Sequence, residues 1–167
     1  MIRRFMLHRS LMRILPALLA LVVLAACDKQ RLYEENKEFT HQAWVVSDEP
    51  SFSFVIEDSV QTYDLSYNLR NSIQYEWDRI FVSYSLTDST GTVLAKKLVY
   101  HDLFDPTGRP LGESGIGDLY DHQFLLLPGY RFPHRGTYTV RLTQFSRQDT
   151  LRGVLAVGLR VARATPE

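Results

Sequence analysis

The sequence predicts an all-β protein: a single antiparallel β-sandwich of about seven or eight strands, preceded by a cleaved lipoprotein signal peptide. Two observations predict the sandwich. Apolar and polar residues alternate in several short segments, and Gly, Pro, Asp and Ser separate those segments. A third observation predicts the signal peptide, because an apolar N-terminal run ends at the only cysteine in the chain.

Residues 1–26 have the layout of a secretory signal. Four arginines and no acidic residue accompany the run "ILPALLALVVLAA". This run is shorter than the roughly 20 residues that a transmembrane helix needs, which favours a cleaved signal over a permanent span. The tetrad Leu24-Ala25-Ala26-Cys27 resembles the bacterial lipobox, in which the chain is cut before the cysteine. An ordinary signal peptide cut after Ala26 is the alternative.

Cys27 is expected to carry a lipid. One cysteine cannot form an intramolecular disulfide, and its position after an apolar run does not suit a catalytic thiol. A diacylglyceryl thioether and an acylated amine, with palmitate among the acyl chains, would hold the protein on a membrane stably. No other cofactor is expected.

The charge of the mature chain argues against nucleic acid as a partner. The whole chain has 19 basic and 19 acidic residues, and four arginines leave with the signal, so 15 basic residues face 19 acidic ones, a net charge of −4. A mildly acidic body lacks the basic footprint that nucleic acid or anionic lipid requires.

One domain follows the signal. Residues 27–42 are charged and polar and predict a short lipid-anchored linker, which Tyr33 and Phe39 could pin to the fold and in which residues 30–38 could form a helical turn or two. Residues 43–163 predict the β-sandwich, and residues 164–167 a C-terminal tail.

Period-two alternation predicts which side chains face the core. In each of four segments, alternate residues are apolar or aromatic and their neighbours are mostly polar. The predicted inward sets are Phe52, Phe54 and Ile56; Tyr63, Leu65, Tyr67 and Leu69; Ile80, Val82, Tyr84 and Leu86; and Tyr138, Val140 and Leu142. Further strands are predicted in "TVLAKKLVYHDLF", "QFLLLPGYRF" and "RGVLAVGLRVA".

Residues 104–123 interrupt this rhythm and predict a long irregular loop, rich in Pro and Gly. Long loops on a rigid sandwich often carry function, so we expect a binding surface here and not an active site. A passive insertion is the alternative. The expected surface consists of Pro110, Gly112, Gly115, Gly117, Asp118, Tyr120 and His122.

The sequence offers no convincing catalytic or metal-binding motif, and we expect a non-enzymatic protein. Ser114 lacks the second glycine of a nucleophile elbow, because Ile116 stands there. The histidines are scattered singly, without the spacing of zinc ligands. Five acidic residues in this region do not match an EF-hand; they are Asp102, Asp105, Glu113, Asp118 and Asp121.

Aromatic residues are more informative about function than these catalytic and metal-binding motifs. Eight of them fall at strand ends, in loops and in strand interiors: Tyr33, Trp44, Tyr75, Trp77, Tyr100, Tyr120, Tyr130 and Phe132. Most are expected to pack in the core or at its rim. A cluster on one sheet face or at one loop end would be the best candidate for a protein-binding patch.

The order of several sequence blocks resembles the GldH gliding-motility lipoproteins of Bacteroidota. After the lipobox these blocks are "YEENKEF" with Trp44, "FSFVIEDSVQTYDLSYNLRNSIQY", "PLGESGIGD", "YRFPHRGTYTV" and "DTLRGVLAVGLRV". The resemblance implies a lipid-anchored envelope protein that works with the gliding and type IX secretion machinery through protein contacts, without catalysis. We expect the outer membrane, with the body in the periplasm.

Two other functions stay open at the level of sequence. A carbohydrate-binding sandwich would use exposed Trp44, Trp77 or Tyr120. A hydrolase would need acidic residues and a histidine to converge in one pocket near residues 102–122.

Overall fold

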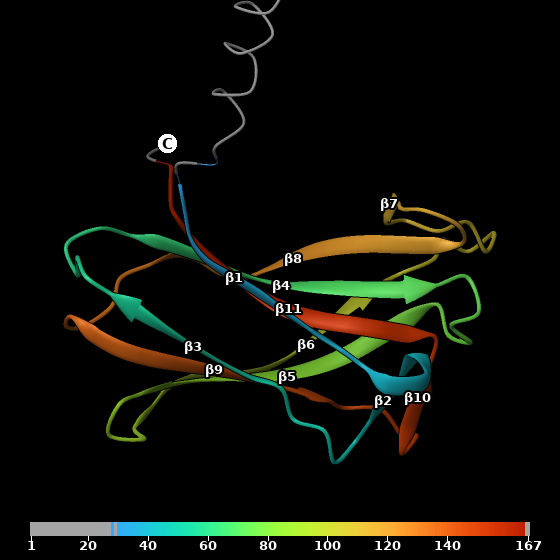
Figure 1. Ribbon diagram of the computed structural model, residues 1–167, viewed down its shortest axis with the longest axis horizontal. Coiled ribbons are helices and arrows are strands. Elements are labelled where there is room, and N and C mark those ends of the chain that lie inside the picture. Colours follow the sequence, from blue (N-terminus) through green and yellow to red (C-terminus); the bar gives the residue numbers. More distant parts are fainter. Residues whose placement is uncertain (1–27, 29, 166–167) are drawn as a thin grey trace, which may run out of the picture.

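The described part of the chain is an antiparallel β-sandwich, as predicted. The structure, a computed structural model, describes residue 28 and residues 30–165 (Figure 1). Over these residues the only helix is the 3-10 turn η2 (Thr40–Gln42). Two sheets stack face to face, and apolar side chains from both fill the space between them.

The larger sheet has five strands, in the order β1-β11-β4-β8-β7. Their bounds are β1 Arg31–Glu38, β11 Val154–Arg163, β4 Tyr63–Ser72, β8 Leu119–Tyr130 and β7 Glu113–Ser114. The smaller sheet has four strands, in the order β3-β9-β5-β6. Their bounds are β3 Ser51–Ile56, β9 Gly136–Gln144, β5 Arg79–Asp88 and β6 Val93–Asp102. The short strands β2 (Ala43–Val45) and β10 (Thr150–Arg152) pair with each other.

All four predicted inward sets are buried between the sheets, because alternate residues of a strand point to the same face. Phe132, which lies between β8 and β9, is at the centre of an aromatic cluster. Its ring contacts those of Phe54, Tyr63, Tyr130 and Tyr138. Such T-shaped and tilted contacts join the two sheets beyond simple area burial.

The segment expected to be a linker is largely a strand. Residues 31–38 form β1, which pairs along β11 from Arg31↔Ala162 to Glu38↔Ala156, so neither a linker nor a helical turn describes it. Alternation of apolar and polar residues did not predict β1, because β1 is a charged strand at the sheet edge and only its Tyr33 packs against the core. Phe39 does pin the segment, since it is buried and stacks on Trp44 at 5.4 Å.

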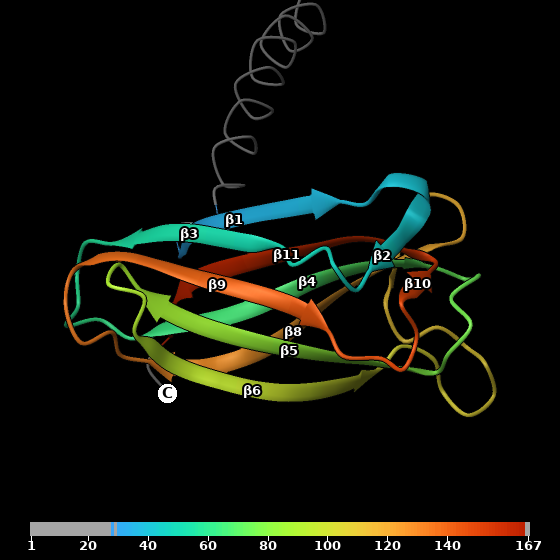
Figure 2. The same ribbon diagram turned by 90° about the horizontal axis from the view of Figure 1, so that it is seen from below.

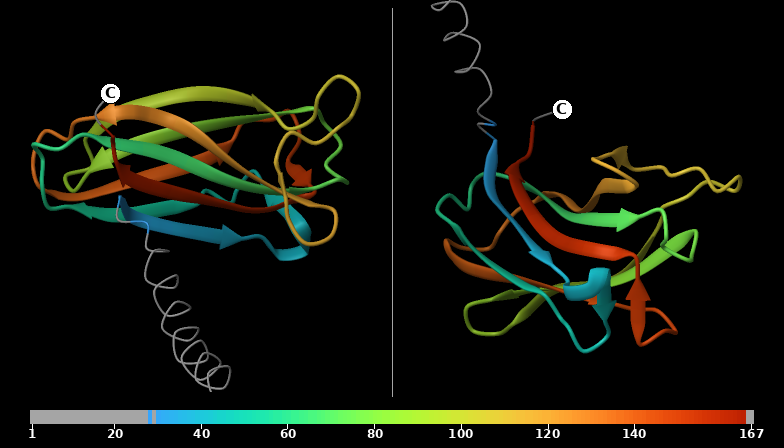
Figure 3. Two further views of the ribbon diagram at one scale, coloured as in Figure 1. Left: turned by 90° about the horizontal axis from the view of Figure 1, so that it is seen from above. Right: turned by 45° about the vertical axis from the view of Figure 1, so that its right-hand side comes forward.

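The strands run between two ends of the sandwich. We call the end with residues 28–31, 57–62, 89–92, 129–135 and 163–165 the N-terminal end, and there the main-chain N–H of Arg163 donates to the carbonyl of Gln30. The other end, here the distal end, holds residues 39–50, 73–78, 103–118 and 145–153 (Figure 3). A ten-residue strand spans about 33 Å, so the two ends are well separated.

Candidate functional site

The loop expected at residues 104–123 is shorter and more ordered than predicted. The irregular part spans residues 103–118, interrupted by β7, and it begins with buried Leu103 and Phe104. Asp105 closes a turn by accepting hydrogen bonds from Thr107 and from the main-chain N–H of Arg109. The Thr107 hydroxyl is the main cause that lowers the pKa of Asp105 to about 2.

The predicted surface residues are divided between this loop and β8. Gly115, Gly117 and Asp118 are exposed in the loop, whereas Pro110 and Gly112 are half-buried. Tyr120 and His122 do not belong to a loop; they lie in β8, opposite Asn71 and Leu69 of β4. The prediction that residues 119–123 are irregular was therefore wrong, because β4 pairs with them to the end of both strands.

His122 points toward the space between the sheets. Its Nε2 lies 2.9 Å from Asn71 Oδ1, and because an amide oxygen only accepts, Nε2 carries the proton. The ring stacks on Phe124, which stacks in turn on His101 of β6. A Cβ at position 112 would lie 2.6 Å from Nε2, so only glycine lets the loop cover this histidine.

Burial controls the protonation of this cluster. Desolvation lowers the pKa of His101 and of His122, although nearby Asp102 and Asp121 act in the opposite direction. Desolvation also raises the pKa of Tyr67 well above its ordinary value. Within the described residues, Tyr67 Oη and His101 Nε2 are buried without a hydrogen-bond partner. The rings of His101, His122, Phe124 and Tyr67 thus form an uncharged, partly buried cluster that joins β4 and β8 of one sheet to β6 of the other.

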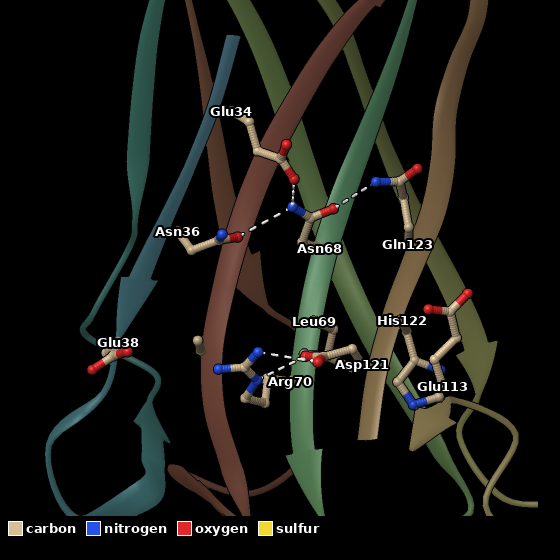
Figure 4. A pocket seen from close by; sticks show the side chains of 11 residues that line it. Glu34, Asn36, Glu38, Asn68, Leu69, Arg70, Glu113, Asp121, His122 and Gln123 are labelled. Carbon is tan, nitrogen blue, oxygen red and sulfur yellow. Dashed lines mark hydrogen bonds and ion pairs between the residues drawn. The ribbon is translucent and has the colours of Figure 1, made fainter. Parts of the chain in front are cut away.

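The outer face of the five-stranded sheet carries a polar groove of about 690 Å³ (Figure 4). Ala156 on β11 lines this groove, and Gly158, two residues further along β11, lies between Asn36 of β1 and Asn68 of β4. Eleven residues line the groove: Glu34, Asn36, Glu38, Asn68, Leu69, Arg70, Glu113, Asp121, His122, Gln123 and Ala156. Most of them are polar and come from neighbouring strands.

The polar side chains of this groove bond to one another. Asn68 donates to Glu34 and to Asn36, and it accepts from Gln123. Arg70 forms two bonds with Asp121, at 2.7 and 3.0 Å. These bonds join side chains of β1, β4 and β8 (Figure 4), so many polar groups of this face have partners within the face itself.

The outer face of the four-stranded sheet is different, because it exposes large apolar side chains. We call five of them, at its distal end, the aromatic platform. They are Trp77 (48% exposed), Phe81 (38%), Leu98 (46%), Tyr100 (58%) and Phe145 (62%). All except Tyr100 line a hollow of about 790 Å³.

Strand pairing builds the aromatic platform. Tyr100 on β6 lies opposite Phe81 on β5, and the main-chain N–H of Phe145, just past β9, donates to the carbonyl of Phe81. The three side chains thus form a row across adjacent strands. Arg79 lies over the Tyr100 ring at 4.5 Å and pairs with Asp102 at 2.6 Å, which fixes one border of the platform.

The sequence pointed to this platform only in part. An aromatic cluster on one sheet face or at one loop end was named as the best candidate for a protein-binding patch, and Phe81 falls at an outward position of the β5 alternation. Phe145 and Leu98 were missed, because their meeting depends on the register of β9, β5 and β6. Trp44, one of the three residues that the carbohydrate-binding alternative would expose, is fully buried, and its Nε1 donates to the carbonyl of Asp48.

The described residues show neither a metal cluster nor a membrane-spanning helix. No three His, Cys, Asp or Glu side chains among them are placed to hold a metal ion. No helix in the described part is long and apolar enough to cross a bilayer. Ser114 Oγ has only a long contact with the carbonyl of Gly115. The signal peptide and the predicted lipidation site Cys27 lie outside the described residues.

The described residues form a single-domain β-sandwich with a polar groove on the outer face of one sheet and exposed apolar side chains on the outer face of the other. The chain belongs to the GldH lipoprotein family, whose model matches residues 31–161. The family predicted from the sequence blocks is therefore confirmed.

Two relatives match over nearly their whole length. One is the gliding motility lipoprotein GldH homolog of Christiangramia forsetii, 28% identical over 93% of this chain and 98% of the relative. The other is the gliding motility lipoprotein GldH of Flavobacterium johnsoniae, 27% identical over 86% of this chain and 92% of the relative.

A solved structure is far more distant. The subviral particle of the VP2 protein of infectious bursal disease virus aligns with a TM-score of 0.42 and 14% identity, over 82% of this chain and 33% of that one. This likeness is too remote to bear on function.

Proposed function

We propose that the protein is a lipid-anchored envelope component of a gliding motility apparatus that acts through protein contacts and catalyses no reaction. The observation that carries the proposal is the family match, which covers almost the entire sandwich. The names of both relatives supply the link to gliding and to a lipoprotein. The aromatic platform supports action by contact, because exposed apolar clusters rimmed by polar residues are typical of protein interfaces.

The proposed anchor orients the domain. Three residues separate Cys27 from the start of β1 at Arg31, and the four residue steps between them extend at most about 14 Å. A lipid on Cys27 would therefore hold the N-terminal end of the sandwich close to the bilayer. The distal end, with the aromatic platform and loop 103–118, would face away from it.

We propose the outer membrane, with the body on its periplasmic side, where the domain would contact the type IX secretion and motility machinery. The acidic mature chain and the short approach to the membrane are compatible with this placement. Protease treatment of intact cells tests the orientation, because a periplasmic body survives until the outer membrane is opened. Digestion in intact cells would contradict it.

A Cys27→Ser variant tests the anchor and its importance. The full chain with this change should leave the membrane fraction, lose fatty-acid labelling and fail to restore gliding in a strain that lacks the gene. Ser10→Ala, in the signal segment, is a matched control that leaves the lipobox intact. Normal gliding of the deletion strain itself would contradict the proposed function.

Loop 103–118 is proposed to contribute to binding through its exposed tip. Gly115, Gly117 and Asp118 are exposed, and Ile116 is 96% exposed. Replacing residues 113–117 by a Gly-Ser linker spares Asp105, Pro110 and Gly112, which order the loop and cover His122. Loss of gliding in a folded variant would support the proposal, and normal gliding would show that the tip is passive.

Carbohydrate binding remains a second candidate, because Trp77 and Tyr100 of the aromatic platform are both exposed and the charged residues Asp78, Arg79 and Arg147 line the adjoining hollow. A glycan array with the purified sandwich tests it. Binding that Trp77→Ala removes would favour this function over protein contact.

A further inference from the structure

β6 is an edge strand of the four-stranded sheet. It pairs with β5 on one side, and within the described residues no strand pairs with its other side, as Figure 2 shows at the border of the molecule. From Ala95 to Asp102 the pairing with β5 is regular over eight consecutive residues. Such an edge presents main-chain N–H and C=O groups in the geometry that a further strand requires.

We infer that β6 accepts an extended segment of a partner protein as an added strand, with the segment's apolar side chains on the aromatic platform and its acidic side chains beside Lys96 and Lys97. This deepens the proposed function, on which it rests, by naming the surface and the chemistry of the partner. Main-chain bonds would supply affinity, and the platform would select the side chains.

The platform adjoins the open edge directly. Leu98 and Tyr100 project from β6 itself, toward the outer face, and Phe81 lies behind Tyr100 on β5. An added strand places alternate side chains on that same face, about 4.8 Å from those of β6. Two successive outward residues of the segment would therefore cover Leu98 and Tyr100.

The positive charge of β6 indicates which kind of partner segment it would bind. Lys96 and Lys97 are exposed in the middle of β6, and neither has an ion-pair partner among the described residues. Acidic side chains on the added strand would lie across from them, and opposite charges across neighbouring strands stabilise pairing.

The same two lysines disfavour a second copy of this chain as the occupant. Two β6 strands related by a twofold axis near their centres would set lysines of one copy close to lysines of the other, and like charges on facing strands destabilise pairing. Exposed lysine on an edge strand is a common device against self-association.

A glycan and a membrane fit this surface less well. The rings of Phe81 and Tyr100 are inclined by 47°, so they do not form one flat stacking plane, and Phe81 and Phe145 offer no hydrogen-bonding group. The platform also lies at the distal end, away from the proposed lipid. A protein segment, which brings both apolar side chains and main-chain groups, matches the edge and the platform together.

Photo-crosslinking in living cells tests the inference on the full, processed chain. A benzoylphenylalanine is placed at Leu98 on the platform or, as the matched control, at Leu125, which is 51% exposed on the outer face of the five-stranded sheet. Crosslinked peptides are mapped by mass spectrometry. Lys96→Glu with Lys97→Glu reverses the charges of β6, and Arg131→Glu with Arg135→Glu makes the same charge change at the N-terminal end.

The inference predicts a protein adduct at position 98, absent at 125, that maps to one extended segment with acidic residues. The adduct should fall about tenfold or more with the β6 lysine reversal and persist with the arginine reversal. A synthetic peptide of that segment should slow hydrogen exchange in residues 93–102 of the purified sandwich. Adducts with this chain itself, with glycan or with lipid would each overturn the inference, as would equal adducts at 125 or exchange that is unchanged.

This test separates the inference from the proposed function. If deletion of the gene abolishes gliding while the β6 lysine reversal leaves gliding and crosslinks intact, strand addition is wrong and the motility role stands. If deletion leaves gliding intact, the motility role fails.

Discussion

The outer face of the five-stranded sheet is mostly polar, whereas the outer face of the four-stranded sheet exposes large apolar side chains. Both consist of outward side chains on antiparallel strands. On the five-stranded sheet many of these side chains are polar and bond to one another, as Asn68 does with Glu34, Asn36 and Gln123. On the four-stranded sheet, Phe81, Tyr100 and Phe145 form a row that stays open to solvent. A face whose groups satisfy one another needs no partner, whereas exposed apolar area gains free energy when a partner covers it.

The difference follows from single positions on the strands. Small residues at 156 and 158 of β11 leave room for Asn36 and Arg70 to lie along the polar face. On the other face, bulky residues occupy neighbouring outward positions in β5, β6 and just past β9, so they stand together above the sheet. The comparison can be tested by filling the polar face and by removing parts of the aromatic one.

The largest expected effect on stability comes from Gly158→Ala. The added Cβ would overlap Asn36 Oδ1 and lie 2.5 Å from the main-chain oxygen of Glu35, so β1 would have to shift. We expect a loss of about 2 kcal/mol in the free energy of unfolding. Urea denaturation measures it. Adding Asn36→Ala should recover part of the loss, and an unchanged midpoint in the single variant would show that β1 is loosely held.

The second effect is a pH dependence of the free energy of unfolding, which comes from the two histidines at the edge where the two sheets meet. Burial lowers the pKa values of His101 and His122 in the folded state, so below about pH 6.5 the unfolded chain binds more protons and stability falls as the pH falls. This stability is fully present above the ordinary histidine pKa. Urea midpoints at pH 8 and pH 5.5 measure the loss, which should shrink in His101→Gln with His122→Gln. An equal loss in that variant would contradict the assignment.

The smallest effect is expected for the ion pair of the polar face. Arg70 and Asp121 are both roughly half exposed, and exposed pairs contribute about 0.2–1 kcal/mol. Arg70→Met should therefore lower the unfolding free energy by less than about 1 kcal/mol and leave gliding normal. Loss of gliding in a strain whose Arg70→Met protein is folded would show that the polar face is needed for function.

Sequence reasoning predicted what depends on one strand at a time. The alternation of Ile80, Val82, Tyr84 and Leu86 was enough to orient β5, since burial and pleat act residue by residue. β1 was missed because its neighbours in the sheet, and not its own apolar content, hold it in place. Residues 119–123 were taken for a loop because they continue a Pro- and Gly-rich stretch that breaks the alternation, although β4 pairs with them.

The surfaces were harder to predict because they depend on which strands become neighbours. Tyr100, Phe81 and Phe145 are far apart in sequence, and only the register of β6, β5 and β9 brings them into one row. Asn36, Asn68 and Gln123 meet through the same kind of long-range pairing. The predicted surface around residues 110–122 was instead chosen by contiguity, and the structure divides it between a loop tip and a strand.

The most direct test of the account compares two leucines of similar exposure on opposite faces. Leu98 belongs to the aromatic platform and is 46% exposed, while Leu125 is 51% exposed on the outer face of the five-stranded sheet. Gliding speed is measured in strains that carry Leu98→Ser or Leu125→Ser in the full chain, at equal protein levels. If the aromatic platform binds the partner, gliding is slow or absent with Leu98→Ser and normal with Leu125→Ser. Normal gliding for Leu98→Ser, or equal impairment by both changes, would contradict it.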